Sequence, residues 1–106
     1  MNHCSFTGFL TEDPRLHESN GVSQARFTIV TYNYRTAKST GEKSRIPTFI
    51  SCEAWHTGAE TICKLFKKGS KIHVHASAKH ISKDNRDIIF RVNEFDSSSP
   101  REDIDA

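Results

Sequence analysis

The chain has 106 residues and a formal net charge of +2, with 35% hydrophobic and 26% charged residues. This length accommodates a single core. No stretch approaches the roughly 18 apolar residues of a spanning helix, which excludes a transmembrane protein. The first residues carry no apolar signal core, so we do not expect secretion. The three cysteines, Cys4, Cys52 and Cys63, are odd in number and widely spaced, which favours free thiols in the reducing cytoplasm.

The charge is distributed unevenly along the chain. Residues 1–93 hold 14 Lys and Arg against 8 Asp and Glu, whereas residues 94–106 hold 1 against 5. A basic body with an acidic end is compatible with a polyanionic partner, and the alternative is a solvated surface with a frayed tail. We expect residues 97–106 to form a short, acidic, disordered tail.

Period-two alternation of apolar residues predicts three strands in the first half of the chain. Their expected ranges are Cys4–Leu10, Ser23–Tyr34 and Thr48–Trp55. Asp13-Pro14 ends the first strand, and Asn20-Gly21 is a turn pair because both residues tolerate positive φ. The polar segment 36–44 is expected to be a mobile loop, with Pro47 starting the third strand.

One helix and two further strands follow. Thr57-Gly58-Ala59-Glu60 has the form of a capping box. The helix then carries one apolar stripe, made up of Ala59, Ile62, Cys63 and Phe66. Alternation returns at Lys71–His80 and at Asp87–Phe95.

The predicted order is three strands, one helix and two strands. This order favours an all-β fold with one short helix, in which five strands close into a barrel and the helix lies between the third and fourth strands. Closure removes the unpaired edges of short strands. We therefore expect residues 1–96 to form one domain with the OB-fold.

Aromatic residues lie on the expected outer face of this barrel. Alternation places Phe49 and Trp55 opposite the inward set of Ile50, Cys52 and Ala54, and Tyr32 and Tyr34 share a face on the preceding strand. Exposed rings next to basic residues suit the binding of single strands, because bases stack on the rings. The alternative is that the rings cover the barrel ends or a subunit interface.

Two groups of basic residues are candidates for contacts with phosphates. They are Arg35, Lys38, Lys43 and Arg45 near the central loop, and Lys79, Lys83 and Arg86 around the last hairpin. The alternative is that these residues are solvated loop charges.

Metal, cofactor and catalytic sites are not expected. His73 and His75 lie on one strand face, but the chain lacks the clustered Cys and His spacing of zinc sites, and these histidines fit the binding face beside Ser77 and Lys79 better. The chain has no phosphate-binding glycine loop, nucleophile elbow or HExxH motif. We therefore expect a protein without cofactor that is not an enzyme.

The order and spacing of several short motifs resemble the bacterial single-stranded DNA-binding proteins, from Met1 to about Phe95. The motifs are Gly8-Phe9-Leu10-Thr11-Glu12-Asp13-Pro14, Asn20-Gly21, Ala25-Arg26-Phe27-Thr28-Ile29, Phe49-Ile50-Ser51-Cys52-Glu53-Ala54-Trp55 and Leu65-Phe66-Lys67-Lys68-Gly69-Ser70. The resemblance implies binding of single-stranded DNA in replication, recombination or repair, in the cytoplasm at the nucleoid. Phe49 and Trp55 fall on two stacking positions of the family. A third family position falls beside Tyr34, at Arg35 in an ungapped alignment, and Tyr32 and Tyr34 are the candidates for it.

The resemblance also implies a homo-oligomer, most often a tetramer and otherwise a dimer. The first strand is the natural pairing edge, with Cys4, Phe6 and Gly8 as the expected interface residues. Lys83 stands where the family often has an aromatic residue. The acidic end lacks the Pro-Phe tip through which the family recruits replication and repair proteins.

Two alternative functions remain open. The short tail and hairpin are similar to primosomal replication protein N, a dimeric restart factor that binds single strands and a helicase. The other alternative is an OB-fold module that binds a protein partner through the aromatic face. The lysines of the central loop argue against it, because lysine is depleted in the core of protein interfaces. RNA in place of DNA also remains open, because stacking and phosphate contacts do not read the 2′-hydroxyl.

Overall fold

The computed structural model describes residues 1–97. The predicted acidic tail therefore lies outside the described residues, apart from Ser97, which ends the last strand. The elements in chain order are β1 (Cys4–Leu10), β2 (Arg15–Ser19), β3 (Val22–Thr36), β4 (Lys43–Trp55), α1 (His56–Leu65), β5 (Lys71–His80) and β6 (Ile88–Ser97). Within this part of the chain no helix is long and apolar enough to cross a membrane.

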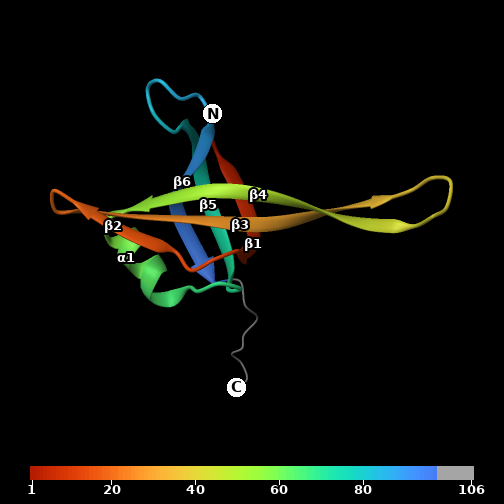
Figure 1. The fold of residues 1–106 in the computed structure, drawn as a ribbon, viewed down its shortest axis with the longest axis horizontal. Coiled ribbons are helices and arrows are strands. Elements are labelled where there is room, and N and C mark those ends of the chain that lie inside the picture. Colours follow the sequence, from red (N-terminus) through yellow and green to blue (C-terminus); the bar gives the residue numbers. More distant parts are fainter. Residues whose placement is uncertain (98–106) are drawn as a thin grey trace, which may run out of the picture.

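Five of the strands close into a barrel. The sheet order is β1-β5-β6-β4-β3-β2, and β1 also pairs with β3 at Phe9↔Val30 and Leu10↔Ile29. This additional pairing joins the two sides of the sheet and leaves β2 outside the ring (Figure 1). The predicted five-stranded barrel is confirmed, with α1 between its third and fourth strands, which are β4 and β5.

The strand β2 was not predicted from the sequence. It pairs with β3 from Arg15↔Arg26 to Ser19↔Val22, and the turn between them is the predicted Asn20-Gly21 pair, with φ of 53° and 76°. All five residues of β2 are exposed. A strand without a buried face has no apolar alternation, so the pattern that predicts the other strands gives no signal here.

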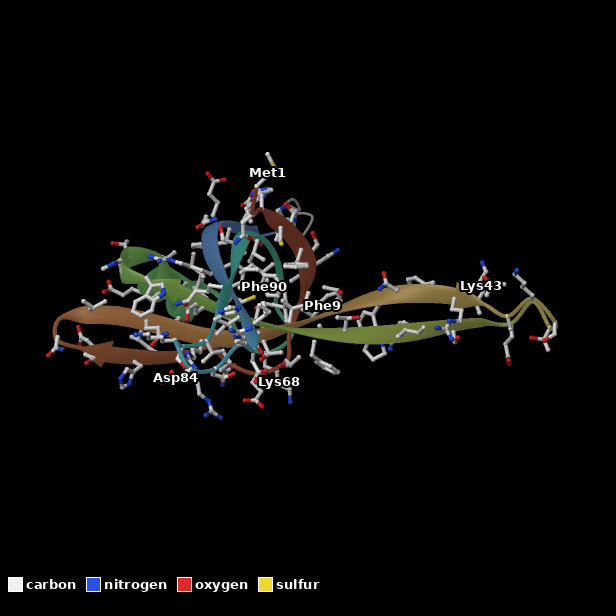
Figure 2. The ribbon with its side chains drawn as sticks, turned by 90° about the horizontal axis from the view of Figure 1, so that it is seen from above. Met1, Phe9, Lys43, Lys68, Asp84 and Phe90 are labelled. Carbon is white, nitrogen blue, oxygen red and sulfur yellow. The ribbon has the colours of Figure 1, made fainter. Side chains whose placement is uncertain are left out.

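The β3–β4 hairpin is longer than the sequence suggests. The two strands stay paired to Thr36↔Lys43, so the loop is only residues 37–42 and the expectation of a loop over 36–44 is wrong. Pro47 lies inside β4, opposite Tyr32, and does not begin the strand. The strand tolerates a proline there because β4 pairs with β6 only at Cys52 and Glu53 and is an edge strand near Pro47. The hairpin forms the long arm on the right of Figure 1, and Figure 2 shows Lys43 on this arm, away from the barrel.

The core lies between the barrel and the helix. Leu10, Ile29, Ile50, Ile72 and Val74 fill the barrel. The predicted stripe on α1 is confirmed, because Ala59, Ile62 and Phe66 are buried and Cys63 packs against the same cluster.

The predicted capping box of the helix is wrong. Trp55 is the N-cap residue and makes no side-chain cap hydrogen bond. The Glu60 carboxylate instead accepts a hydrogen bond from Ser23 Oγ at 2.8 Å, which ties the helix to β3.

Candidate nucleic-acid interface

The four predicted stacking residues lie on one face of the β3–β4 hairpin. Paired residues of neighbouring strands point to the same side of a sheet. The pairs on the outer side are Gln24↔Trp55, Arg26↔Glu53, Thr28↔Ser51, Val30↔Phe49, Tyr32↔Pro47 and Tyr34↔Arg45. Phe49 is 65% and Tyr34 is 73% exposed, while Trp55 and Tyr32 are half-buried. We call this surface the aromatic face; the stacking roles of its rings stay predictions.

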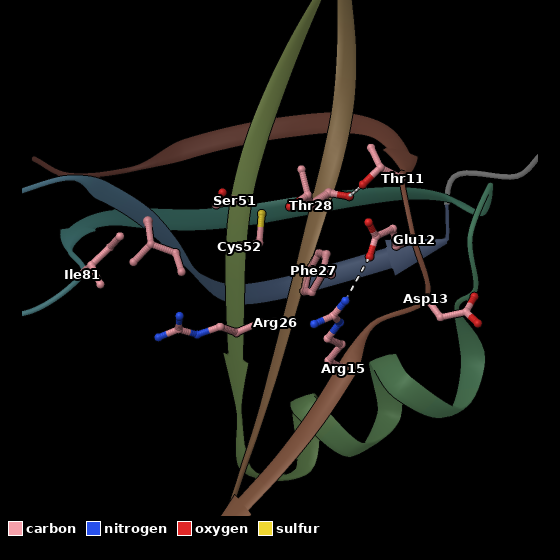
Figure 3. A pocket seen from close by; sticks show the side chains of 11 residues that line it. Thr11, Glu12, Asp13, Arg15, Arg26, Phe27, Thr28, Ser51, Cys52 and Ile81 are labelled. Atoms are coloured by element: carbon pink, nitrogen blue, oxygen red, sulfur yellow. Dashed lines mark hydrogen bonds and ion pairs between the residues drawn. The ribbon is translucent and has the colours of Figure 1, made fainter.

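A pocket of about 270 Å³ opens beside the middle of the aromatic face, and neither Phe49 nor Trp55 lines it. The lining residues of its floor include Arg26 and Thr28 from β3 and Ser51 from β4. Thr11, Glu12 and Asp13, which follow β1, lie on one side of the pocket and Ile81 lies on the other (Figure 3). Ile89 also lines the pocket. Phe49 and Trp55 are six residues apart in one strand, which separates their positions by roughly 20 Å. Ser51, which lines the pocket, lies between them in the strand.

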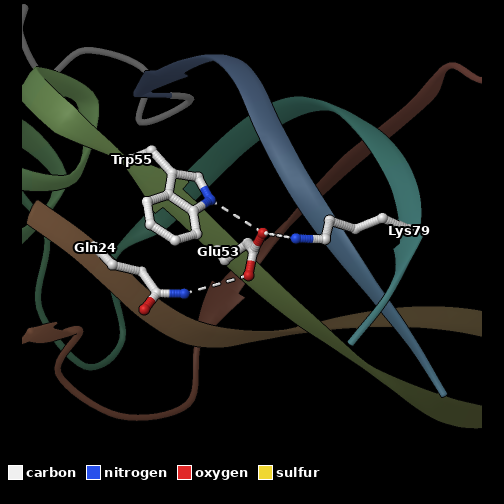
Figure 4. Close-up of polar contacts among 4 residues, drawn as sticks. All are labelled: Gln24, Glu53, Trp55 and Lys79. Carbon is white, nitrogen blue, oxygen red and sulfur yellow. Dashed lines mark hydrogen bonds and ion pairs between the residues drawn. The ribbon is translucent and has the colours of Figure 1, made fainter. Parts of the chain in front are cut away.

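A buried carboxylate supports the Trp55 end of this face. Glu53 is only 1% exposed although its side chain points outward. Its Oε2 accepts hydrogen bonds from Trp55 Nε1 at 3.0 Å and Lys79 Nζ at 2.9 Å, and its Oε1 accepts one from Gln24 Nε2 at 3.3 Å (Figure 4). The indole edge is therefore fixed by residues of three strands.

Opposing effects act on the pKa of Glu53. Desolvation by burial raises it, but the hydrogen bonds from Lys79 and Trp55 and the charges of Lys79 and Arg26 lower it by more. The net pKa lies below its ordinary value, so Glu53 is an anion at neutral pH. Trp55 and Lys79 thus donate to a charged acceptor, which makes both hydrogen bonds stronger than neutral ones.

Glu53→Gln is expected to lower the free energy of unfolding by about 1–3 kcal/mol at neutral pH, because it removes the charge from these hydrogen bonds. The folded-state pKa is lowered, so the stabilisation is complete above the ordinary glutamate pKa of about 4.3 and is lost as pH falls through the folded value. Urea unfolding at a series of pH values from 7 to 3 measures the free energy of unfolding of both proteins. The difference between Glu53→Gln and wild type should shrink as the pH falls below about 4.3. Glu94→Gln changes an exposed carboxylate of β6 and is the control. Equal stability of Glu53→Gln and wild type at pH 7 would contradict the prediction.

The predicted basic residues are spread over three places. Arg45 lies on the aromatic face with its Cζ 4.1 Å from the Tyr32 ring centroid, and Lys43 follows on the same side of the arm. Arg35 alternates with Tyr34 and points to the opposite side of the arm. The remaining loop residues are exposed: Lys38 at the tip of the arm, and Lys83 and Arg86 between β5 and β6. Lys79 is held by Glu53, and its contact with phosphate stays a prediction.

Three arginines of this surface were not among the predicted site residues. Arg91 of β6 lies with its Cζ 5.9 Å from the Trp55 ring centroid. Arg26 and Arg15 line the pocket, and Arg15 pairs with Glu12 at 3.5 Å. The alternation along β3 is enough to predict that Arg26 lies on the aromatic face. Arg15 and Arg91 reach this face through strand pairings that the sequence does not show.

The two histidines lie on another part of the barrel. His73 Nδ1 is 2.6 Å from Thr7 Oγ1, and His75 Nδ1 is 2.9 Å from Ser5 Oγ, so both contact β1. Both histidines belong to β5, the strand of Lys79, and β6 separates β5 from β4 in the sheet order, so their place on the binding face stays a prediction. Within residues 1–97 no group of three or more His, Cys, Asp or Glu is arranged to hold a metal ion.

The cysteines are free thiols, as predicted. Cys52 lies inside the barrel, and burial raises its pKa to about 12. A thiol with this pKa stays protonated at neutral pH and is a poor nucleophile.

A closed five-stranded barrel with one helix between its third and fourth strands is the architecture of an OB-fold. The sequence model of the single-strand binding protein family matches residues 1–91. The chain therefore belongs to the single-strand binding protein family, which confirms the resemblance.

Solved structures show the same fold. The wild-type single-stranded DNA-binding protein of Thermus aquaticus superposes with a TM-score of 0.78 at 20% sequence identity, over 95% of this chain and 52% of that one. A deletion mutant of the same protein, with residues 228–252 removed and an R190A substitution, gives the same values. The chain thus spans about half the length of the Thermus aquaticus proteins it matches. A comparison with curated proteins finds no match.

Proposed function

We propose that this chain binds single-stranded DNA without strong sequence preference and acts in replication, recombination or repair. The observation that carries the proposal is the aromatic face, on which Trp55 and Phe49 share the outer side of β4 with Ser51, a residue that lines the pocket together with Arg26 and Arg15. Rings accept the π-face of any base, and each stacked base contributes roughly 1–3 kcal/mol by alanine substitution. Membership of the single-strand binding protein family supports the same reading.

In this proposal Trp55, Phe49, Tyr32 and Tyr34 stack bases. The phosphates are contacted by Arg35, Lys38, Lys43, Arg45, Lys79, Lys83 and Arg86. Three further arginines, Arg15, Arg26 and Arg91, join this set because they lie on the same surface. The chain performs no catalysis and uses no cofactor. Because Arg45 lies over the Tyr32 ring, the two act as one unit in which the cation sits between ring and phosphate.

We further propose that the chain works as a homo-oligomer, a tetramer or a dimer, that pairs through β1. Within the described residues, Cys4 to Gly8 pair with β5 on one edge only, and β3 joins the other edge at Phe9 and Leu10. The side chains of Cys4 and Phe6 face the barrel interior, because they pair with the buried Ala76 and Val74. Phe6 packs there on Phe90 at a centroid distance of 5.0 Å, and Gly8 has no side chain to offer. The backbone edge of β1, rather than these side chains, is therefore what the strand offers to a partner.

Titration with oligothymidine is expected to quench the fluorescence of Trp55, which is the only tryptophan in the chain. Affinity should fall with salt, with a slope of log K against log salt of about −0.7 for each phosphate contact. Titrations at two salt concentrations, with duplex DNA as the control, measure both effects. Absence of binding to the single strand in an independent assay would refute the proposal, and binding without quenching would place the groove away from Trp55.

A further inference from the structure

One exposed ring lies outside the predicted set of stacking residues. Phe9 is 40% exposed on the outer side of β1, whereas its neighbours Gly8 and Leu10 are buried in the barrel. Single exposed rings are common on protein surfaces. What distinguishes Phe9 is its position relative to the aromatic face.

Phe9 is joined to Phe49 by a continuous apolar row. The register pairs Phe9 of β1 with Val30 of β3, and Val30 with Phe49 of β4. Since paired residues share a face, the three side chains lie side by side across three strands on the outer surface. Val30 is only 8% exposed, so it forms a closed floor between the two exposed rings. Two strand spacings put the rings roughly 10 Å apart.

A lysine stands at the outer end of this row. Lys71 of β5 is the partner of Phe9 in the β1–β5 pairing, and its Nζ is 5.8 Å from the centroid of the Phe9 ring. Within residues 1–97 Lys71 makes no ion pair. Lys71 and Asp96 both line a second pocket, between the end of α1 and β6, but they do not pair there. The row therefore combines a ring, which suits a base, with a cation that is available to a phosphate.

The direction of the row differs from that of the aromatic face. Trp55 and Phe49 follow the length of β4, whereas Phe49, Val30, Phe9 and Lys71 run across the strands. A strand that follows both sets of residues turns at Phe49 and crosses β3 onto β1 and β5. The exposed surface of this row is continuous with the aromatic face at Phe49.

We propose that Phe9 and Lys71 form a further nucleotide subsite, in which Phe9 stacks one base of single-stranded DNA and Lys71 contacts its phosphate. This inference rests on the proposed function and extends it by naming the path of the bound strand beyond Phe49. The sheet registers place the subsite next to Phe49 and remote from Trp55. It lengthens the site without a new loop or domain.

The test uses two variants at Phe9 and a control elsewhere, in the full chain. Phe9→Leu removes the ring and keeps an apolar side chain, Phe9→Tyr keeps the ring, and Leu16→Ala shortens an exposed apolar residue of β2. Affinity for labelled oligothymidines of increasing length is measured by fluorescence anisotropy. For the longest oligomer, Phe9→Leu should weaken binding about five- to tenfold, the lower end of the effect of losing one stacked base. Phe9→Tyr and Leu16→Ala should bind like wild type.

Length and salt provide readouts that a general loss of folding would not reproduce. An oligomer just long enough to reach from Trp55 to Phe49 should bind Phe9→Leu and wild type equally. Lys71→Gln should reduce the salt slope for long oligomers by about 0.7, which corresponds to one phosphate contact on a single strand. An oligothymidine with one 5-iodouracil should crosslink to Phe9 on irradiation, as read by mass spectrometry.

The outcomes separate this inference from the function on which it rests. Equal affinity of Phe9→Leu and wild type, while Phe49→Ala binds more weakly, overturns the subsite and leaves the proposed function intact. A wild type that does not bind oligothymidine overturns both. If Phe9→Leu changes the sedimentation of the free protein and weakens oligomers of all lengths equally, Phe9 belongs to a contact between copies of the chain and the subsite is refuted.

Discussion

Trp55→Ala is expected to weaken binding of single-stranded DNA by about 1–3 kcal/mol, or roughly 5- to 150-fold, without unfolding the domain. The indole is half-buried, its Nε1 is fixed by Glu53 and its ring lies near the Arg91 guanidinium. A ring held in this way loses little freedom when a base stacks on it, so most of the stacking energy contributes to affinity. Because the variant has no tryptophan, binding is measured by the anisotropy of a labelled oligothymidine.

Trp55→Phe separates the two properties of this side chain. Phenylalanine retains a ring for stacking but cannot donate to Glu53, so its affinity should lie between those of wild type and Trp55→Ala. Circular dichroism of all three proteins checks that the barrel is intact. Wild-type affinity in a folded Trp55→Ala would remove Trp55 from the site.

Gly8→Ala is expected to destabilise the barrel by about 1–3 kcal/mol, the usual effect of overpacking in a closed core. A Cβ at position 8 would collide with the backbone carbonyl of Val30 and lie 3.1 Å from Thr31 Cγ2. A backbone carbonyl cannot rotate away as a side chain can, so β1 and β3 would have to separate. These strands close the barrel through Phe9↔Val30 and Leu10↔Ile29, so separation weakens closure itself.

Gly58→Ala is the matched control for this prediction. Gly58 lies in α1, and the nearest atom to a Cβ there is Phe95 Cε1 at 3.9 Å. Alanine is favoured over glycine in a helix by about 0.8–1 kcal/mol, so this variant should be as stable as wild type or more stable. Urea unfolding, followed by Trp55 fluorescence, measures both. A Gly8→Ala protein with wild-type stability would show that β1 does not approach β3 as closely as described.

The sequence predicts those parts of the fold that bury one face of a strand or helix. The barrel strands show apolar alternation because Ile50, Cys52 and Ala54 point inward, and their outward neighbours locate Phe49 and Trp55. β2 and the outer half of the arm have no buried face, so period two is absent there and their strands were missed or shortened. The turn at Asn20-Gly21 was still predictable, because its signal is the backbone conformation of two residues and not burial.

The parts of the site that were not predicted depend on contacts between distant strands. Alternation puts Glu53 on the outer face, but it does not show that Trp55 and Lys79 bind the carboxylate there and that it is buried. Its burial arises in part because the side chain of Lys79 on β5 reaches across β6 to the carboxylate, a contact that no local pattern encodes. The same holds for Phe9, whose proximity to Phe49 exists only through Val30 on the strand between them.

The exposed arm also bears on how folding and binding are linked. Beyond Tyr32 and Pro47 both of its strands are exposed, and their pairing down to Thr36↔Lys43 rests on backbone hydrogen bonds without a core beneath. Such a segment opens locally at a much lower free energy than the whole barrel, so the arm is its own cooperative unit. A DNA strand that binds Tyr34 and Arg45 must bind the closed form, and its apparent affinity therefore includes the closing equilibrium of the arm. Substitutions that stiffen the arm, remote from any nucleotide, would then tighten binding by preorganisation alone.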